Sequence, residues 1–491
     1  MVAFKHPDEI DKAGDYNLSH IDLINHKGDT LDLKLIVVEL NIYESIYKNA
    51  VTGTVVITDA KNQIGRLQIQ GLERISFKLS TPGASKKNVT LDASAETGEP
   101  FHVYKITDRK QAGPGVLMYT LHFASREFMR NIRTKVSQAY EGRLDEAVQS
   151  IFKDKDYLDS RKRLKFEPTG NADKIVIPNL RPFDAIQMIA EKSLPEKSGG
   201  TGYFFYETTK AYHFRSWESM VTTQGSAKRV PKQTFFYMPL KHKDDNIKDE
   251  IGHKFKSVQS YRFINNFHDV AANTALGTYG QRVITHNLYD KSYNIADYNY
   301  HNSYQQSVHT DYTNDYTDRY KYAIATTPVD YDNVKGVSDY PESLTTLQST
   351  TQFLHNTPSG GYGINVFADG YMKSKRISQF NQILHGTCLK LVVKGQSYLE
   401  PGDLIEFRMR PVDSDPTDVE EDYRYGGQYI ISKIRHQVTT EDYVMVLECA
   451  KDSVVNPVVM GSPEYVANSE RAELYDIYEN EGTSHLTNIH G

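Results

Sequence analysis

"NIYESIYKNAVTGTVVITDA", residues 41–60, is the stretch that decides the fold class. From residue 36 onward, apolar and polar positions alternate with the period of two that a half-buried β-strand requires. The connection at 48–53 leads into a second, β-branched run at 54–58, so the stretch predicts two consecutive strands. It contains no set of side chains suited to catalysis, which indicates a structural element.

The rest of the first 125 residues continues the strand pattern. Alternation begins again at 67–69 and at 75–79, and two longer strand-like runs follow at 102–111 and 115–125. Successive strands without helices between them pair most simply as antiparallel neighbours. Residues 1–125 therefore predict a small antiparallel sheet or barrel.

The period changes to that of helices after residue 125. "RLDEAVQSIFKD" (143–154) places five apolar residues on one helical face, namely Leu144, Ala147, Val148, Ile151 and Phe152. Acidic residues occupy its first turn, where the helix dipole favours them. A second helix is predicted within 177–193, and a strand pair within 202–217 turns near 208–210. Residues 126–225 predict a compact α+β domain.

The third part, residues 226–455, is again rich in strand patterns but carries an unusual insertion at about 265–365. Ten tyrosines crowd residues 289–331 among Asn, Asp, Ser and Thr, with few aliphatic side chains. Such a segment builds little core alone, so we expect an extended insertion laid on another surface, such as a neighbouring subunit. Beyond it the sequence predicts a helix at 373–385 that stops at Gly386. Strands follow at 387–395, 402–410, 426–438 and 443–450, and residues 456–491 form a polar tail.

Composition limits the function classes. The 491 residues are 39 % hydrophobic and 24 % charged, with a formal net charge of −6. No stretch approaches the roughly 18 apolar residues of a membrane helix, and the first residues lack a signal-peptide pattern. The net negative charge gives no attraction of the whole molecule to nucleic acid.

Two residue types stand out in the counts. Cys388 and Cys449 each lie in an apolar run and are expected to be reduced core thiols, with a disulfide between them left open. Tyrosine occurs 34 times against a single tryptophan, Trp217. Because tyrosine combines a large apolar face with a hydroxyl group, this excess favours protein–protein contact.

A search for chemistry finds no catalytic, metal or cofactor motif. The sequence has no P-loop, no G-x-S-x-G elbow and no H-E-x-x-H pair. His301 and His309 match no familiar metal spacing and are expected to be solvated loop histidines. The acidic stretches at 244–250 and 413–422 lack the ligand order of an EF-hand. Basic "SRKRLKF" (160–166) is suited to phosphate binding, but a charge run on a domain surface is the simpler interpretation.

Four stretches together carry a family resemblance. They are residues 39–77 with a "GxE" step at Gly71 and Glu73, 139–154, 177–220, and 375–448 with the turn 401–403 and His436 on the closing hairpin. In this order and spacing the chain resembles the baseplate hub proteins of contractile-tailed, myovirus-type phages. More remotely, it is similar to the hub-like part of type VI secretion spike proteins. The insertion and the tail depart from the shared pattern.

The resemblance implies a β-rich α+β fold with two tail-tube-like antiparallel β-barrel domains, at 1–125 and within 226–455, and an outer α+β domain at 126–225. It implies a structural homotrimer in the virion tail baseplate, assembled in the host cytoplasm and without enzymatic activity or cofactor. The trimer would join the sixfold tail tube, or its initiator proteins, to the threefold central spike. Its channel would pass DNA and the tape-measure protein, and baseplate wedge proteins would surround it.

Two further expectations follow from this resemblance. A long hairpin at residues 41–60 can donate an edge to the sheet of a neighbouring subunit, and Tyr43 and Tyr47 are the candidates for intersubunit contact. Buried positions within one chain fit these tyrosines equally well. The alternative function is a tail-tip protein with glycan-binding or cell-wall-degrading activity, for which an inserted domain with its own core would be needed.

Overall fold

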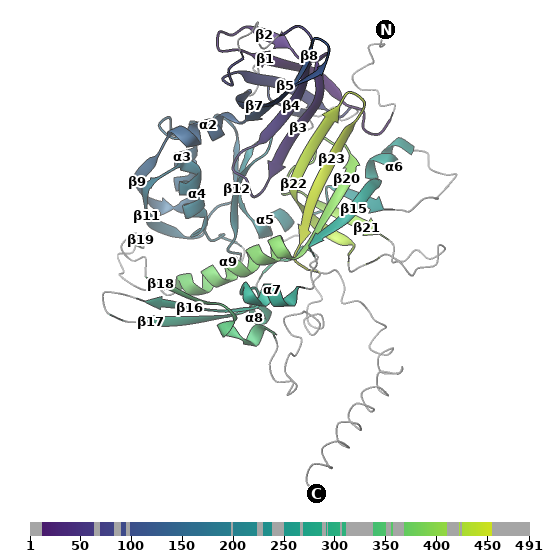
Figure 1. Cartoon of the computed structure of the whole chain (residues 1–491). Coiled ribbons are helices and arrows are strands. Elements are labelled where there is room, and N and C mark those ends of the chain that lie inside the picture. Colours follow the sequence, from purple (N-terminus) through teal and green to yellow (C-terminus); the bar gives the residue numbers. More distant parts are fainter. Residues whose placement is uncertain are drawn as a thin grey trace, which may run out of the picture.

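The computed structural model describes a β-rich chain, drawn in Figure 1. The described residues are 12–62, 69–82, 90–94, 99–197, 200–222, 229–237, 250–265, 269–286, 291, 293–304, 307–310, 337–349, 355–356, 368–409, 422 and 425–453. The tail at 456–491, the loop at 360–365, most of both acidic stretches and the tyrosines from 312 to 331 lie outside them.

The N-terminal β unit consists of β1 (Asn17–Ile24), β2 (Thr30–Asp32), β3 (Val37–Ser45), β4 (Thr52–Asp59), β5 (Arg74–Ser80), β6 (Thr90–Asp92), β7 (Phe101–Gly113) and β8 (Val116–Ala124). Its strands pair antiparallel in the order β3-β4-β8-β7-β5-β1-β2, with β6 on β5. The two strands predicted around residues 41–60 are β3 and β4, and they pair as a hairpin. The predicted antiparallel sheet is therefore confirmed.

The "GxE" step has a clear local role in this unit. Gly71 has a φ of +88°, in the left-handed region where glycine is favoured. The buried carboxylate of Glu73 accepts hydrogen bonds from the backbone nitrogens of Gln70, Gly71 and Leu72 at 2.7, 2.8 and 3.0 Å. The side chain thus satisfies the backbone of the turn that leads into β5.

The C-terminal β unit consists of β14 (Gln233–Tyr237), β15 (Val258–Asn265), β20 (Thr387–Lys394), β21 (Leu404–Met409), β22 (Gly427–Thr439) and β23 (Tyr443–Lys451). These strands pair in the order β14-β21-β22-β23-β20-β15. An isolated parallel bridge from Phe236 to Ser257 joins β14 to the residue before β15, which closes the ring of pairs. The predicted helix before β20 is α9 (Ala368–His385), and it ends at Gly386 as expected.

The two β units are joined into one sheet through β3 and β22. These strands pair antiparallel over seven residues, from Ser45 with Lys433 to Glu39 with Thr439. Both edges of the β3–β4 hairpin are therefore occupied within the chain, by β22 on one side and β8 on the other. The prediction that this hairpin donates an edge to the sheet of a neighbouring subunit is wrong, because the strands that pair with it belong to the same chain.

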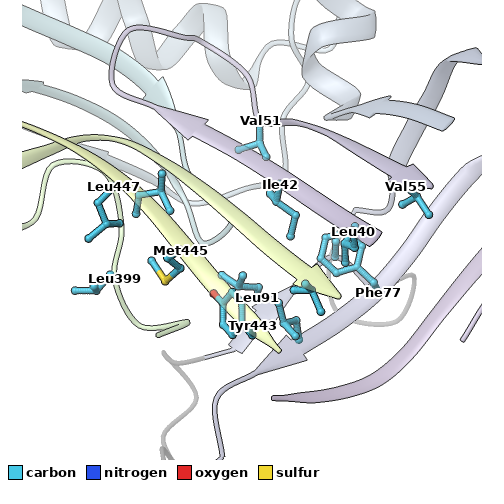
Figure 2. Close-up of a cluster of buried hydrophobic side chains, with 14 of the residues drawn as sticks. Leu40, Ile42, Val51, Val55, Phe77, Leu91, Leu399, Tyr443, Met445 and Leu447 are labelled. Atoms are coloured by element: carbon cyan, nitrogen blue, oxygen red, sulfur yellow. The ribbon is translucent and has the colours of Figure 1, made fainter. Parts of the chain in front are cut away.

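A single hydrophobic core extends through both β units (Figure 2). Leu40, Ile42 and Phe77 of the N-terminal unit belong to the same buried cluster as Tyr443 and Met445 of the C-terminal unit. Each fully buried side chain of this size contributes about 1.5–3 kcal/mol. The shared core and the continuous sheet hold the two units in a fixed relation.

The α+β unit lies beside this sheet (Figure 1). It contains α2 (Arg126–Arg133), α3 (Leu144–Lys153), α4 (Pro182–Ala190), α5 (Trp217–Val221), β9 (Val136–Arg143), β10 (Leu164–Phe166), β11 (Ala172–Leu180), β12 (Tyr203–Glu207) and β13 (Tyr212–Ser216). The predicted helices at 143–154 and within 177–193 correspond to α3 and α4, and the predicted strand pair is β12–β13. The five apolar residues predicted on one face of α3 are all buried in a separate core cluster.

The described part of the tyrosine-rich insertion is folded rather than extended. It contains α7 (Val270–Ala275), β16 (Gly280–His286), β17 (Tyr293–Asn299), α8 (Tyr300–Tyr304), two 3-10 turns η4 (Val337–Asp339) and η5 (Pro341–Ser343), β18 (Thr345–Ser349) and β19 (His355–Asn356). The helix α6 (Glu250–Lys256) precedes the insertion and contacts β14 and β20. Strands β17, β16 and β18 form a small sheet that contacts α9. Its buried cluster consists mostly of tyrosines, namely Tyr279, Tyr298 and Tyr300 with Val337. Tyrosine rings therefore form most of the hydrophobic core of this small sheet, where aliphatic side chains are scarce.

The two cysteines are free. Leu389 pairs with Cys449 and Cys388 pairs with Ala450 on neighbouring strands, so the two sulfur atoms point to opposite faces of the sheet. Cys449 belongs to the core shared by the β units, whereas Cys388 packs against the cluster beside α9. The expectation of reduced thiols is confirmed, and the strand geometry disfavours a disulfide.

Candidate functional site

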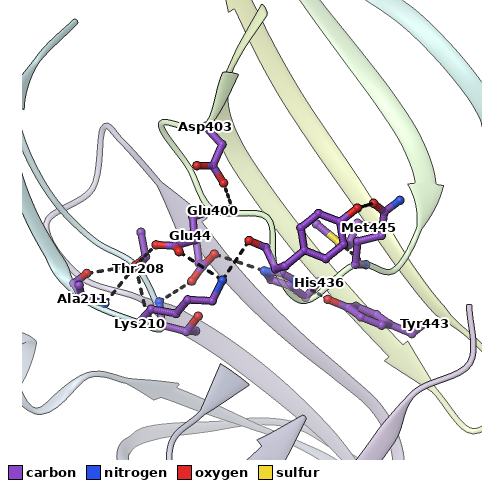
Figure 3. Close-up of polar contacts among 12 residues, drawn as sticks. Glu44, Thr208, Lys210, Ala211, Glu400, Asp403, His436, Tyr443 and Met445 are labelled. Carbon is purple, nitrogen blue, oxygen red and sulfur yellow. Dashed lines mark hydrogen bonds and ion pairs between the residues drawn. The ribbon is translucent and has the colours of Figure 1, made fainter. Parts of the chain in front are cut away.

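The candidate site is a polar seam where the α+β unit meets the junction of the two β units (Figure 3). The tight turn between β12 and β13 supplies three residues, Thr208, Thr209 and Lys210. The backbone nitrogen of Thr209 donates to Glu44 of β3 at 2.5 Å, and the Thr208 hydroxyl donates to Glu400 at 3.1 Å. These contacts connect all three units at one place.

Glu44 also faces the C-terminal β unit. Its second carboxylate oxygen lies 3.3 Å from Nε2 of His436, and Nδ1 of His436 lies 2.6 Å from the Tyr443 hydroxyl oxygen. The side chains of Glu44 and His436 are fully buried. Because β3 and β22 pair with Ile42 opposite His436, the strand register itself sets this contact. His436 of the family pattern is therefore part of the junction.

Glu400 anchors the other side of the seam. Lys210 Nζ lies 3.2 Å from one of its oxygens and donates to the Tyr398 carbonyl at 3.1 Å, while His213 Nε2 lies 3.6 Å from the other oxygen. Burial by itself would raise the pKa of the Glu400 carboxylate. The neighbouring His213 and Lys210 outweigh this effect and hold the pKa well below its usual range. Burial lowers the pKa of His213 to about 4, so this imidazole is neutral at pH 7.

A second buried ion cluster ties the α+β unit together. Lys162 Nζ donates to Glu127 at 2.9 Å and to Glu207 at 2.5 Å. Glu207 in turn accepts a hydrogen bond from the backbone nitrogen of Val51, just before β4, at 2.8 Å. The expectation that residues 160–166 form only a surface charge run is wrong for Lys162, because two buried carboxylates neutralise it. This lysine is not presented to a phosphate.

The structure gives Tyr43 and Tyr47 partners within the chain. The Tyr43 ring lies 6.0 Å from the Arg435 guanidinium, and the Tyr47 ring packs edge-on against Phe204 at 6.2 Å, with Lys433 Nζ 5.9 Å away. Both rings are half-buried in one chain. Their contact with a neighbouring subunit stays a prediction.

The sequence predicts two solvated loop histidines in the insertion, His301 and His309. His309 is buried, and its Nδ1 lies 2.8 Å from a carboxylate oxygen of Asp452, so the prediction of a solvated histidine is wrong for it. Asp452 also accepts hydrogen bonds from the backbone nitrogen and hydroxyl of Thr310. Together these contacts fasten the insertion to the end of β23. His301 lies in α8.

The seam holds the three units together through buried polar contacts. Its carboxylates are saturated by backbone nitrogens, lysines and histidines, and within the described ranges no three His, Cys, Asp or Glu side chains are grouped to hold a metal ion. Among the helices that the structure describes, none is long and apolar enough to cross a membrane. Sequence periodicity could not identify the seam, because its members come from turns and strands up to 392 residues apart.

The chain is similar to proteins of phage tails. No family model matches it. Over 444 residues it is 19 % identical to the probable baseplate hub protein gp334 of Vibrio phage KVP40, which covers 87 % of this chain and 92 % of that protein. The predicted resemblance to baseplate hub proteins is confirmed.

Solved structures that match the chain include the tail protein from Neisseria meningitidis MC58, at 9 % identity and a TM-score of 0.47 over 90 % of this chain and 98 % of that one. They also include the E. coli c3393 protein, a component of the type VI secretion system described as structurally similar to T4 bacteriophage tail proteins gp27 and gp5. That match has 9 % identity and a TM-score of 0.40, over 89 % of this chain and 77 % of the other.

Proposed function

We propose that the chain is a structural subunit of a phage baseplate hub. Three copies form a ring that joins the sixfold tail tube to the threefold central spike and leaves a channel for DNA. The observation that carries this proposal is the similarity to the Vibrio phage hub protein, which runs along 87 % of this chain and 92 % of the relative. It therefore involves all three units rather than one shared module.

The internal architecture supports a ring. Each chain contributes two β units that are fixed to each other by the β3–β22 pairing and one core. Three chains thus supply six β units, two per chain, which suits a threefold assembly that faces a sixfold tube. A loosely linked pair of domains would not keep the six units at constant spacing.

The face of the joined sheet that points away from its core is proposed as the channel wall. We call it the outer face and define it by five adjacent strands, β23, β22, β3, β4 and β8. On these strands the buried core residues alternate with half-exposed ones, for example Val55 with Thr54 on β4 and Leu447 with Val446 on β23. The outer face runs without interruption across both β units.

The remaining parts take supporting positions in this proposal. The α+β unit, near residues 126–225, lies on the outside of the ring, and the surrounding wedge proteins and the tube or its initiator proteins contact the assembled hub. The hub belongs to the virion tail and assembles in the host cytoplasm. The seam supports a role without catalysis, since Glu44, Glu400 and His436 are already engaged by partners inside the protein.

Electron microscopy of the purified chain tests the proposal. Class averages should show a ring with threefold symmetry, six similar densities around a central opening and three peripheral densities for the α+β units. A matched sample of Glu44→Ala, which removes the buried contact between the units, should give fewer intact rings. Particles of one chain's size, or rings whose six densities are absent, would contradict the proposed assembly.

A further inference from the structure

A small polar cavity lies where the insertion meets α9 and the α+β unit. The small sheet of the insertion runs along α9, and α8 also contacts this helix (Figure 1). The walls of the cavity include Trp217 of α5, Gln382 of α9, Asp452 at the end of β23, and Tyr300, Ser307 and His309 of the insertion. Eight of its ten lining residues are buried, so the cavity is largely closed off by protein.

The Trp217 indole is the unexplained polar group in this lining. Its side chain is 2 % exposed, and its Nε1 has no hydrogen-bond partner in the part of the chain that the structure describes. An indole N–H can only donate, and buried donors are nearly always paired. The Trp217 backbone nitrogen is bonded to the carbonyl of Gly202, and the ring packs among Ile383 and Leu404. The indole is therefore fixed in a position where it needs an acceptor.

The other polar groups around the cavity are held in place by printed contacts of their own. The Tyr300 hydroxyl donates to Gln382 Oε1 at 3.0 Å, and Gln382 Nε2 donates to the Ser378 hydroxyl at 3.1 Å. These two bonds fix which end of the Gln382 amide is the oxygen. Because an amide oxygen has two lone pairs, Gln382 Oε1 can accept one more hydrogen bond.

The size of the cavity is suited to one water molecule. The volume open to the centre of a water molecule is about 10 Å³, at the lower end of the roughly 10–15 Å³ that a single buried water requires. We propose that one ordered water occupies this cavity, accepts the Trp217 Nε1–H and donates to Gln382 Oε1. This inference does not depend on the proposed hub function.

The chemistry of the lining favours water over an ion. A cation in the cavity would face the N–H of Trp217, which has no lone pair to offer. An anion would lie near the Asp452 carboxylate, whose pKa is lowered by the neighbouring His309 although burial opposes this, so that it is charged at pH 7. Water both accepts from the indole and donates to the amide oxygen, so it satisfies both walls without a buried charge.

The proposed water connects parts of the chain that are distant in sequence. Trp217 belongs to the α+β unit, and Gln382 is bonded directly to Tyr300 of the insertion. A bridging water is nearly as favourable in enthalpy as a direct hydrogen bond. The insertion is thus seated on the α+β unit through Gln382 and this water, in addition to its direct contact between His309 and Asp452.

A crystal structure of the full chain, at a resolution that shows ordered water, tests the site directly. A density peak is expected about 2.7–3.2 Å from both Trp217 Nε1 and Gln382 Oε1. A map that shows ordered water at other buried polar groups but no peak between these two atoms would overturn the inference.

Raman spectroscopy in solution gives a second, independent measurement. Trp217 is the only tryptophan, so the indole band that shifts with hydrogen bonding of the N–H reports on one group. The unmodified chain should show the band of a hydrogen-bonded indole. Ser307→Val, which places methyl groups in the cavity wall, should displace the water and shift the band toward that of a free indole.

Ser80→Val on β5 is the matched control, because it makes the same exchange outside the cavity, and it should leave the band unchanged. Equal spectra for the two folded variants, or a free-indole band in the unmodified chain, would contradict the water site. Should Ser307→Val fail to fold, the band of the unmodified chain and the crystal structure still decide.

Discussion

Replacing Glu44 by alanine should strongly destabilise the joined β units. The Glu44 side chain is fully buried, accepts from Thr209 N at 2.5 Å and lies 3.3 Å from His436 Nε2. Its removal leaves a backbone donor and a ring nitrogen without an acceptor, each costing about 1–3 kcal/mol. With both groups counted, we expect Glu44→Ala to lower the free energy of unfolding by about 2–6 kcal/mol.

Urea unfolding followed by the fluorescence of the single tryptophan is the assay. Trp217 packs in the cluster that also contains Leu404 and Ile430 of the C-terminal β unit, so its emission reports separation at this interface. Glu448→Ala, which removes an exposed pair with Lys433, is the matched control and should cost no more than about 1 kcal/mol. A loss below about 1 kcal/mol for Glu44→Ala would show that the seam does not hold the units together.

Three further outcomes are expected. Lys162→Met, which leaves two buried glutamates without their cation, should cost about 3–5 kcal/mol in the same assay; a stability equal to that of the unmodified chain would contradict the cluster. Burial raises the pKa of Glu218 to about 6 in the folded protein, above its value of 4.5 in the unfolded chain. Protonation of Glu218 therefore stabilises the folded state fully below pH 4.5, and this stabilisation is lost as the pH rises through about 6. Glu218→Gln should therefore be the more stable protein at pH 8, by about 2 kcal/mol, and equal pH profiles for both proteins would refute this. Finally, denatured protein should titrate two thiols without reductant, because Cys388 and Cys449 are free, and a count of zero would reveal a disulfide.

Local structure could be predicted from the sequence because its causes are local. The alternation on either side of residue 48 specified β3 and β4, and the spacing of apolar residues specified α3. The turn between β12 and β13 fell where predicted, at 208–210. In each case the period of the side chains matches the geometry of one element.

The long-range pairing could not be predicted in the same way. Alternation shows which residues of β3 face a core, but any strand of matching pattern could lie beside it, and β22 begins some 380 residues later. The seam depends on this pairing, so its members had no shared signal in the sequence. A weak hint was present: Glu44 and His436 are polar residues at positions where the alternation predicts burial, and buried polar groups require partners.

The buried histidine and lysine were missed for a related reason. The position of His309 in a polar, tyrosine-rich segment indicated solvent, but in the structure His309 contacts Asp452 and lines a small cavity together with Tyr298 and Tyr300. Lys162 lies within a basic stretch, and only the fold brings two glutamates to it. Charge in the sequence predicts exposure on average, whereas a pair brought together by tertiary structure reverses that expectation.

Light scattering on a sizing column, across a concentration series, tests the central claim most directly. A ring-forming hub subunit predicts a species near three times the 56.0 kDa chain, with its share rising as the protein is concentrated. A chain that remains at 56.0 kDa at the highest concentration would contradict a self-assembling trimeric hub.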